Sequence, residues 1–463
     1  MATEDLFIIA IELGSSKVTG ICGKKLPDGS IHVEAVVQEP SSTFIRNGMI
    51  YNMDKSTQCV TSIIKRLQEQ LKRTVKQVYV GFGGQSIHSL ANAVAENFAG
   101  EVTISKETVD RLLKDNLDAD TGDRDILEVV PQEYNVGTQK QTDPIGVLSD
   151  YIEGNFLNIV ARPTLRSNID SCFEKVGIHV VEDKLVPLTV ADEVLSDTEK
   201  RSGCVLVDFG ADTTTVSVYK GNLLRFISVI PLGSAHITRD IMSLQLEEKD
   251  AEELKLAYGA VATELTEEEA NVVIYTLPDG STIKKQTLLN IVQARIEEIL
   301  QNVKDQITDS GYGRDSLVAG AWLIGGGASL KDLTKAFTEI TGFDKVRVVK
   351  NSRTTVHFAK NTNKNSDGQL LGAISLLAKG NQICTSSVVQ EQVESNIFSG
   401  NDNQSTNVAT PPTEEPEKEP KKEEEVKEKK IKKEKPKKEG PSIFKKAMNR
   451  LKSISEVIVG EDE

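Results

Sequence analysis

Two segments of the sequence place a carboxylate directly before a glycine and a short run of hydroxyl side chains. The first runs from Glu12 to Ser16 (ELGSS), and the second runs from Asp208 to Thr214 (DFGADTT). Glycine permits a tight turn that brings backbone N–H groups against phosphate oxygens, and the hydroxyls add further donors. The carboxylate can hold Mg²⁺ directly or through water. Both segments therefore predict phosphate and magnesium binding.

A third glycine-rich segment, Gly325–Gly327, follows the apolar run AWLI and precedes a predicted helix start. A nucleotide can approach the backbone closely at such a turn. Taken singly, a glycine-rich turn that binds nothing is the commoner explanation. The order of the three segments, and the duplication of the first two, favour a nucleotide site.

An internal repeat indicates which elements position these loops. Residues 7–37 run as apolar strand, acid, glycine, hydroxyl cluster, second strand, tight turn and third strand, and residues 204–230 repeat this order. The turns at Pro27–Ser30 and Lys220–Asn222 are typical of hairpin tips that need a positive φ angle. The repeat predicts a duplicated α/β fold with a cleft between its halves.

Composition limits the class of protein. The 463 residues are 38% hydrophobic and 27% charged, without an apolar run of about eighteen residues, which is typical of a soluble chain. The N-terminus is acidic where a signal peptide is basic, which predicts a protein that is not exported. The net charge of -14 argues against nucleic acid binding by the body. Five scattered cysteines indicate free thiols rather than disulfides or a zinc site.

The C-terminal part of the sequence changes character. Residues 381–441, rich in Pro, Glu and Lys from Asn401 onward, predict a disordered linker. Residues 442–460 predict an amphipathic membrane-targeting helix whose apolar and basic side chains suit an anionic lipid surface. The membrane residues are Ile443, Phe444, Lys446, Met448, Arg450, Leu451, Ile454 and Ile458. The alternative is a helix that packs on the protein's own body, but a flexible linker favours a separate surface.

The three loops resemble the phosphate 1, phosphate 2 and adenosine motifs of the actin, Hsp70 and sugar kinase superfamily. At closer range, residues 5–380 resemble the bacterial cell-division protein family FtsA, including the segments VYVGFGGQSIHS, VVPQEYNV and AEELKLAYGA. The resemblance implies an actin-like, duplicated ribonuclease H-like α/β fold with a small inserted α+β domain. The expected division of the chain is 1–83 with 166–200 (first half), 84–165 (insert), 201–380 (second half), 381–441 (linker) and 442–460 (terminal helix).

The resemblance also implies ATP and Mg²⁺ as ligands. Glu12 and Asp208 would hold the metal. Glu252 and Lys255 would reach the ribose and adenine, although their spacing equally suits an ordinary surface ion pair. The expected nucleotide-binding residues are Gly14, Ser15, Ser16, Lys17, Gly210, Thr213, Thr214, Glu252, Lys255, Gly325, Gly326 and Gly327.

Three departures from the superfamily pattern bear on catalysis. Glu12 stands where Asp is usual, and Asp212 adds a charge near the phosphates unless it turns away or joins the metal shell. Val186 precedes Pro187 where active relatives carry an acid or amide that orients water. Asp192 or Glu193 on the same helix are the possible substitutes. We expect ATP binding with at most weak hydrolysis and assign no catalytic residue.

The resemblance implies a protein that self-associates and anchors filaments of the tubulin-like division protein FtsZ, which form the Z ring. It implies a peripheral location on the cytoplasmic side of the cell inner membrane at the division septum, with recruitment of later division proteins. The FtsZ C-terminal peptide would meet Arg295, interpreted as lying free outside the buried stripe of its helix. The alternatives are a pilus-assembly ATP-binding scaffold of the same superfamily and a true ATPase or sugar kinase.

Overall fold

The computed structural model describes residues 7–261, 264–360 and 368–388. The predicted terminal helix and most of the predicted linker lie outside these ranges. Within them, no helix combines the length and the apolarity needed to cross a bilayer.

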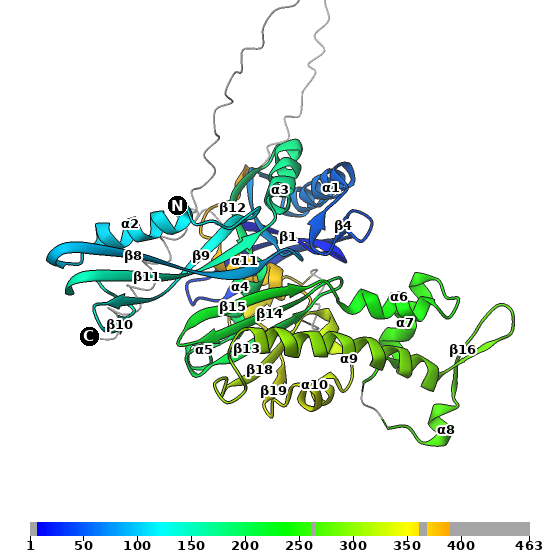
Figure 1. The fold of residues 1–463 in the computed structure, drawn as a ribbon. Coiled ribbons are helices and arrows are strands. Elements are labelled where there is room, and N and C mark those ends of the chain that lie inside the picture. The colour runs from blue at the N-terminus through cyan, green and yellow to red at the C-terminus, as the bar shows by residue number, and fades with distance from the viewer. Residues whose placement is uncertain (1–6, 262–263, 361–367, 389–463) are drawn as a thin grey trace, which may run out of the picture. The chain divides into compact units, whose positions relative to one another are not determined.

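The first half is built on a six-stranded sheet in the order β12-β7-β1-β2-β3-β20. Figure 1 labels β1 and β12 of this sheet, with α1 and α3 beside them. Strands β1, β2 and β3 form an antiparallel meander, and β7 and β12 continue the sheet in parallel with β1. The strands are β1 (Ile8–Leu13), β2 (Lys17–Lys25), β3 (Ile31–Pro40), β7 (Gln77–Phe82), β12 (His179–Leu185) and β20 (Val356–Phe358). The short strands β4 (Ile45–Arg46) and β5 (Met49–Ile50) form a hairpin beside it.

Helices cover both faces of this sheet. On one face lie α1 (Met53–Leu71) and α3 (Pro163–Val176), and on the other lie α4 (Val186–Val194) and α11 (Leu371–Lys379). Two glycines of β2 show the two layers, since Gly20 faces Ile63 of α1 and Gly23 faces Leu377 of α11. A Cβ at Gly20 would lie 2.3 Å from Ile63 Cγ2, so the helix approaches the strand too closely for any other residue.

The second half repeats this arrangement, which confirms the duplicated fold. Its meander is β13 (Cys204–Phe209), β14 (Thr214–Lys220) and β15 (Leu223–Ile230), with β18 (Gly320–Ile324) and β19 (Val346–Val348) continuing in parallel with β13. Its helices are α5 (Asp197–Ser202), α6 (Ser234–Met242), α7 (Glu248–Tyr258), α8 (Glu267–Ala270), α9 (Lys285–Asp309) and α10 (Leu333–Thr341). A hairpin of β16 (Val273–Thr276) and β17 (Thr282–Lys284) precedes α9.

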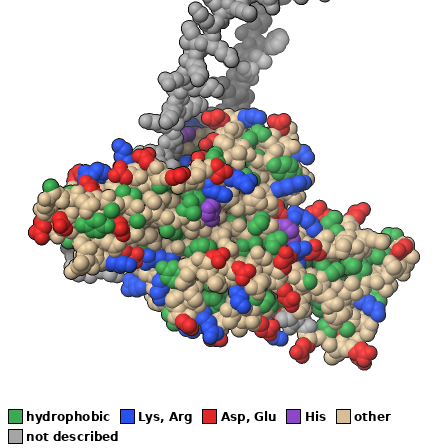
Figure 2. Space-filling model, in the orientation of Figure 1, with side chains coloured by type: hydrophobic (Ala, Val, Ile, Leu, Met, Phe, Trp, Pro, Cys, Tyr) green, Lys and Arg blue, Asp and Glu red, His purple; other side chains and the backbone are tan. Residues whose placement is uncertain are grey.

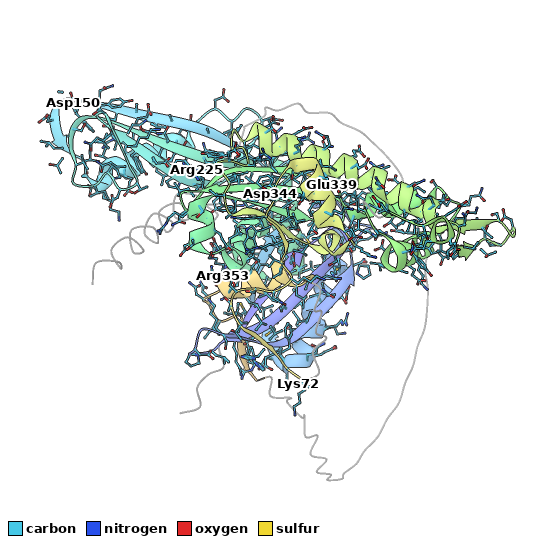
Figure 3. The ribbon with its side chains drawn as sticks, turned by 90° about the horizontal axis from the view of Figure 1, so that it is seen from below. Lys72, Asp150, Arg225, Glu339, Asp344 and Arg353 are labelled. Atoms are coloured by element: carbon cyan, nitrogen blue, oxygen red, sulfur yellow. The ribbon has the colours of Figure 1, made fainter. Side chains whose placement is uncertain are left out.

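Between β7 and α3 the chain forms an antiparallel α+β insert with a hydrophobic cluster of its own. Its elements are β8 (His88–Thr103), α2 (Lys106–Leu117), β9 (Asp125–Val136), β10 (Gln139–Gln141) and β11 (Leu148–Ala161). A single residue pair, Ser228 with His88, joins its sheet to that of the second half and gives nine strands. Figure 3 shows Arg225 near this junction, where it ion-pairs with Glu133, and Asp150 at the far end of the insert.

After α11, backbone hydrogen bonds and a strand pair hold the chain against the first half. The backbone N–H of Cys384 donates to the Phe7 carbonyl at 2.8 Å, and β21 (Thr385–Val388) pairs with β6 (Arg73–Val75). The Tyr79 hydroxyl accepts the N–H groups of Asn381 and Gln382. All five cysteines are buried and free, as predicted. Acidic and basic side chains are interspersed over the face that Figure 2 shows.

Candidate nucleotide site

A cavity of about 630 Å³ lies between the two halves. Every residue predicted to bind the nucleotide or the metal lines this cavity, with the exception of Thr214. The fold therefore brings together segments that are separated by more than three hundred residues in the sequence, such as Glu12–Lys17 and Gly325–Gly327. The site residues on the wall are Glu12, Gly14, Ser15, Ser16, Lys17, Asp208, Gly210, Thr213, Glu252, Lys255, Gly325, Gly326 and Gly327.

The two hairpin loops have the same local geometry. The N–H of Gly14 donates to the Lys17 carbonyl at 3.2 Å, and the N–H of Gly210 donates to the Thr213 carbonyl at 2.9 Å. A Cβ atom at either glycine would lie 2.8 Å from that same carbonyl oxygen. Both turns therefore require glycine, and the internal repeat extends to the loops that face the cavity.

Each hairpin carries a partly buried carboxylate at its base, Glu12 in the first and Asp208 in the second. Burial raises the pKa of Glu12 to about 7, with a further increase from Asp208 and an opposing effect from Lys17. Burial raises the pKa of Asp208 to about 6. Both acids lie against glycines, because a Cβ would be 2.1 Å from Glu12 Oε1 at Gly372 and 2.3 Å from Asp208 Oδ1 at Gly325.

These two carboxylates suit Mg²⁺. The ion binds through one or two carboxylates and completes its shell with waters and ligand phosphates. The described residues contain no cluster of three or more His, Cys, Asp or Glu side chains that would hold a metal by themselves. A divalent cation between Glu12 and Asp208 would favour their ionised forms and offset the cost of burial that raises both pKa values.

The third glycine segment forms the far wall of the cavity. Gly325 has φ +86°, and a short 3₁₀ turn, η1 (Gly326–Ser329), follows it. A Cβ at Gly326 would meet no atom within 4 Å. The backbone is thus open to the cavity at Gly326, as the sequence predicts.

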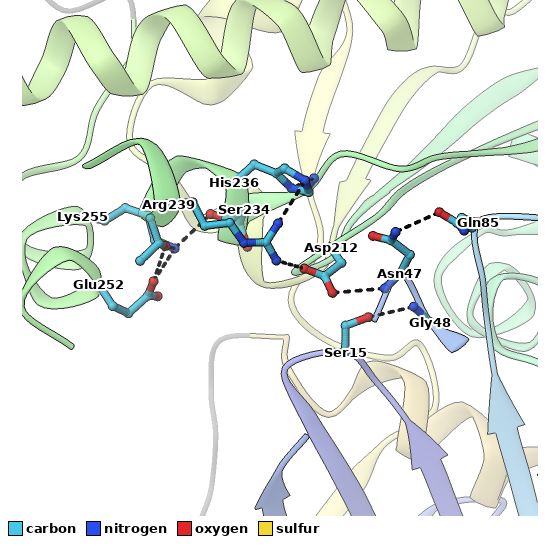
Figure 4. Close-up of polar contacts among 12 residues, drawn as sticks. Ser15, Asn47, Gly48, Gln85, Asp212, Ser234, His236, Arg239, Glu252 and Lys255 are labelled. Atoms are coloured by element: carbon cyan, nitrogen blue, oxygen red, sulfur yellow. Dashed lines mark hydrogen bonds and ion pairs between the residues drawn. The ribbon is translucent and has the colours of Figure 1, made fainter. Parts of the chain in front are cut away.

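Glu252 and Lys255 of α7 form an ion pair at 2.7 Å. The Lys255 side chain is only 8% exposed, and its ammonium also donates to Thr238 Oγ1 at 2.8 Å and to the Ser234 carbonyl at 3.2 Å (Figure 4). An ordinary surface pair leaves its lysine in solvent, so that alternative does not describe this pair. Contact with the ribose and adenine stays a prediction.

The position predicted for Thr214 is wrong. Its side chain is buried, and its hydroxyl donates to the Leu232 carbonyl at 2.8 Å, away from the cavity. Thr213 and Thr215 line the cavity instead. Successive side chains of a strand point to opposite faces, and β14 begins at Thr214. The run of three threonines therefore presents its first and third members to the cavity.

Asp212 turns away from the cavity and joins the two halves. It is 5% exposed, pairs with Arg239 at 2.8 Å, and accepts the backbone N–H of Asn47 at 3.1 Å (Figure 4). The next N–H, of Gly48, donates to Ser15 Oγ at 2.9 Å. Of the two possibilities weighed for Asp212, the structure thus shows the first, since an arginine neutralises its charge. The Asn47–Gly48 turn touches both hairpin loops.

Val186 and Pro187 line the cavity at the start of α4, as the sequence predicts. The two suggested substitutes for the missing acid do not. Asp192 pairs with Lys200 at 2.6 Å and with Lys379 at 2.8 Å, and Glu193 accepts a hydrogen bond from Ser352. Neither is part of the cavity wall. The interpretation of either as a replacement base is therefore wrong.

The interpretation of Arg295 as a free cation is also wrong. Arg295 Nε donates to Asp240 Oδ2 at 2.6 Å, Nη2 donates to Asp240 Oδ1 at 3.0 Å, and the guanidinium also pairs with Glu298. Its side chain is 23% exposed. The arginine is outside the buried stripe of α9, but α6 supplies a bidentate carboxylate that the sequence of α9 does not reveal.

Sequence reasoning missed several residues of the cavity wall. Three of them belong to no recognisable motif. Gly48 lines the cavity from the tip of the β4–β5 hairpin, and Gln369 and Gly372 line it from the start of α11. The Lys17 ammonium donates to Gln369. Gly83 and Gly84 also line the cavity, and the paired glycines after a strand in VYVGFGG were the one available signal.

The repeated sheets with one cavity between them define an actin-like protein. A solved structure of a PilM–PilN type IV pilus biogenesis complex shares this fold with a TM-score of 0.55 at 15% identity, covering 80% of this chain and 97% of that chain. The family model for cell division protein FtsA matches residues 205–366, and that for the SHS2 domain inserted in FtsA matches residues 84–160. The chain belongs to the FtsA family of cell division proteins.

Two curated relatives illustrate this membership. FtsA of Porphyromonas gingivalis is 30% identical over 348 residues, which cover 74% of this chain and 72% of that protein. FtsA of Neisseria meningitidis is 29% identical over 332 residues, which cover 70% of this chain and 80% of that protein. The pilus protein is similar in fold alone.

Proposed function

We propose that the chain binds ATP with Mg²⁺ in the cavity between its halves and serves as a division scaffold. The observation that carries this proposal is the convergence of two equivalent hairpin loops, each with a carboxylate at its base, on one cavity. The volume of about 630 Å³ is within the range of small-molecule sites. No cluster of histidines or cysteines competes as the chemical centre among the described residues.

Residues of both hairpins would contact the triphosphate. Backbone N–H groups of the loops at Gly14 and Gly210 would bind phosphate oxygens, and the hydroxyls of Ser15 and Thr213 would add donors. Lys17, partly buried at the start of β2, would supply a positive charge. Mg²⁺, when bound, neutralises the phosphates. The adenosine would pack directly against the backbone of Gly325–Gly327, because these residues have no side chains.

We expect the bound ATP to be hydrolysed slowly, because Val186 cannot accept a proton or orient water at the cavity wall. With saturating Mg²⁺ and ATP, phosphate release should be at least a hundredfold below the median turnover of enzymes, which is about 10 per second. Glu193→Gln should leave the residual rate unchanged, since Glu193 lies off the cavity wall. Turnover at an ordinary enzymatic rate would refute the assignment of Val186 and favour a true ATPase.

The scaffold role rests on family membership. We propose that the protein self-associates, binds the C-terminal peptide of FtsZ, and anchors FtsZ filaments to the cytoplasmic side of the cell inner membrane at the septum. Later division proteins would then be recruited there. Residues 442–460, which lie outside the described residues, would supply the attachment, and a single weak helix would gain strength when several copies act on one polymer.

We retain Arg295 as the proposed contact for the FtsZ peptide. The peptide would have to compete with Asp240, which already accepts hydrogen bonds from this arginine. Arg295→Gln should weaken binding of an acidic FtsZ C-terminal peptide about fivefold, the effect of roughly 1 kcal/mol for a partly exposed charge pair. Asp240→Asn releases the arginine and should hold the affinity or raise it. Fluorescence anisotropy of the labelled peptide measures both. If both variants bind the peptide as the wild type does, the peptide docks elsewhere.

A further inference from the structure

We propose that a second, smaller pocket beside the insert binds the phosphate group of a soluble ligand, such as a phosphate monoester or pyrophosphate. The pocket has a volume of about 370 Å³, and it shares no lining residue with the cavity between the halves. The residues that matter for the proposal are Gln85, Ser86, His88, Arg124, Arg162 and Ser228.

These residues come from separate parts of the fold. Ser86 follows β7, His88 opens β8, Arg124 directly precedes β9, and Arg162 follows β11 and caps the start of α3. Ser228 lies on β15 and pairs with His88 at the point where the insert sheet meets that of the second half. A ligand in this pocket would therefore contact the insert and the second half at once, beside the start of α3.

The charge of the pocket is positive. Arg124 and Arg162 line it, and no aspartate or glutamate does. Arg124 donates to the Ser86 carbonyl at 3.3 Å and has Asp123 at 3.9 Å, but Asp123 is 87% exposed. The exposed Arg162 side chain has no ion-pair partner in the described part of the chain. A guanidinium carries five N–H donors, so most of them are left for an anion.

Ser86 provides a fixed donor inside the pocket. It is 7% exposed, and its hydroxyl oxygen accepts the backbone N–H of Arg162 at 3.2 Å. Its carbonyl accepts His88 Nδ1 at 3.1 Å. The proton of its hydroxyl has no acceptor among the described residues, and it remains available to a ligand oxygen. Two forked guanidiniums with a hydroxyl donor match the several acceptor oxygens of a phosphate.

The start of α3 adds to the same preference. The first turn of this helix contains no acidic residue, and Arg162 makes no side-chain capping bond. The positive end of the helix dipole thus begins at the pocket wall without a neutralising anion of the chain. Together with the two arginines, it favours a multiply charged anion over chloride.

The pocket lies next to the larger cavity along the chain. Gly83 and Gly84 line the cavity, and Gln85 and Ser86 line the pocket. Asn47 Nδ2 donates to Gln85 Oε1 at 2.8 Å (Figure 4). An experiment with phosphate must therefore distinguish the two sites.

The test is calorimetric titration of the full-length protein with pyrophosphate at constant ionic strength, with and without saturating Mg²⁺ and ADP. We expect binding that persists with ADP and becomes at least tenfold weaker in Arg124→Gln/Arg162→Gln. The matched control is Arg66→Gln/Arg111→Gln, which removes two exposed arginines elsewhere and should bind as the wild type does. Arg162→Gln alone, at an exposed position, decides the matter if the double variant does not fold.

Three results would overturn the proposal. Absence of pyrophosphate binding by the wild type would do so directly. Binding that ADP abolishes and the arginine variants leave unchanged would place the phosphate in the larger cavity. An oligoglutamate peptide that binds more tightly than pyrophosphate with the same arginine dependence would identify the pocket as a site for acidic protein segments.

Discussion

Gly326→Val should reduce ATP affinity by more than a hundredfold while leaving the protein folded. The ideal Cβ of this residue meets no protein atom within 4 Å, and its backbone has no positive φ angle. The added isopropyl group would therefore occupy space in the cavity where the adenosine is expected to approach bare backbone. If the valine side chain displaces ligand contacts worth about 3 kcal/mol of binding free energy, the affinity falls by more than a hundredfold.

The matched control is Gly313→Val, a glycine of the second half that is equally open and does not line the cavity. It should bind ATP normally. Gly325→Val is unsuitable, because φ is +86° there and a Cβ would lie 2.3 Å from Asp208 Oδ1, so the variant should misfold. Equilibrium binding of labelled ATP, with circular dichroism as the check on folding, compares the variants. Unchanged affinity in Gly326→Val would contradict the site.

Changing Phe444 and Leu451 together to Glu should abolish binding to anionic vesicles. Both residues lie near the middle of the predicted apolar arc of residues 442–460. Burial of each side chain is worth about 1.5 to 3 kcal/mol, and each substitution also places a charge where head groups and acyl chains meet. Vesicle co-sedimentation measures the loss. A double variant that still sediments with lipid would mean that the helix packs on protein.

Two companion variants separate the contributions to attachment. Replacing Lys446 and Arg450 with Gln should only weaken vesicle binding, by about 1 kcal/mol per residue, and high salt should mimic this effect. Deleting residues 411–438 should leave vesicle binding of the free protein intact, because the helix supplies affinity and the linker supplies reach. Loss of binding in the deletion variant would assign a direct lipid contact to the linker.

The halves and their loops were predictable because the signals are local. A strand end, an acid, a glycine and hydroxyls stand within a few residues, and the same order recurs near residue 204. The assignment of Thr214 failed on strand register, which decides the face of each side chain and depends on where β14 begins. The residues at both ends of a hairpin turn are the least certain in any sequence pattern.

Contacts between distant segments were not predictable from these signals. Arg295 looked free because its partner, Asp240, is 55 positions away on another helix. Gln369 and Gly372 reach the cavity only because α11 packs across the sheet of the first half. The union of the insert and the second half into one nine-stranded sheet depends on a single residue pair, which leaves no pattern in either strand.

The attachment of the chain after α11 has a mechanical consequence. The backbone from Asn381 to Val388 is held by the Tyr79 hydroxyl, by the Phe7 carbonyl and by the strand pair of β21 with β6. All three anchors belong to the first half. Tension applied to the chain beyond Val388 would therefore be borne by β6 and the sheet of the first half. The hairpin of Gly210 and the glycines after β18 hold none of these anchors, so tension on the tail would reach the second half of the nucleotide site only through contacts between the halves, such as that of Asn47 with Asp212.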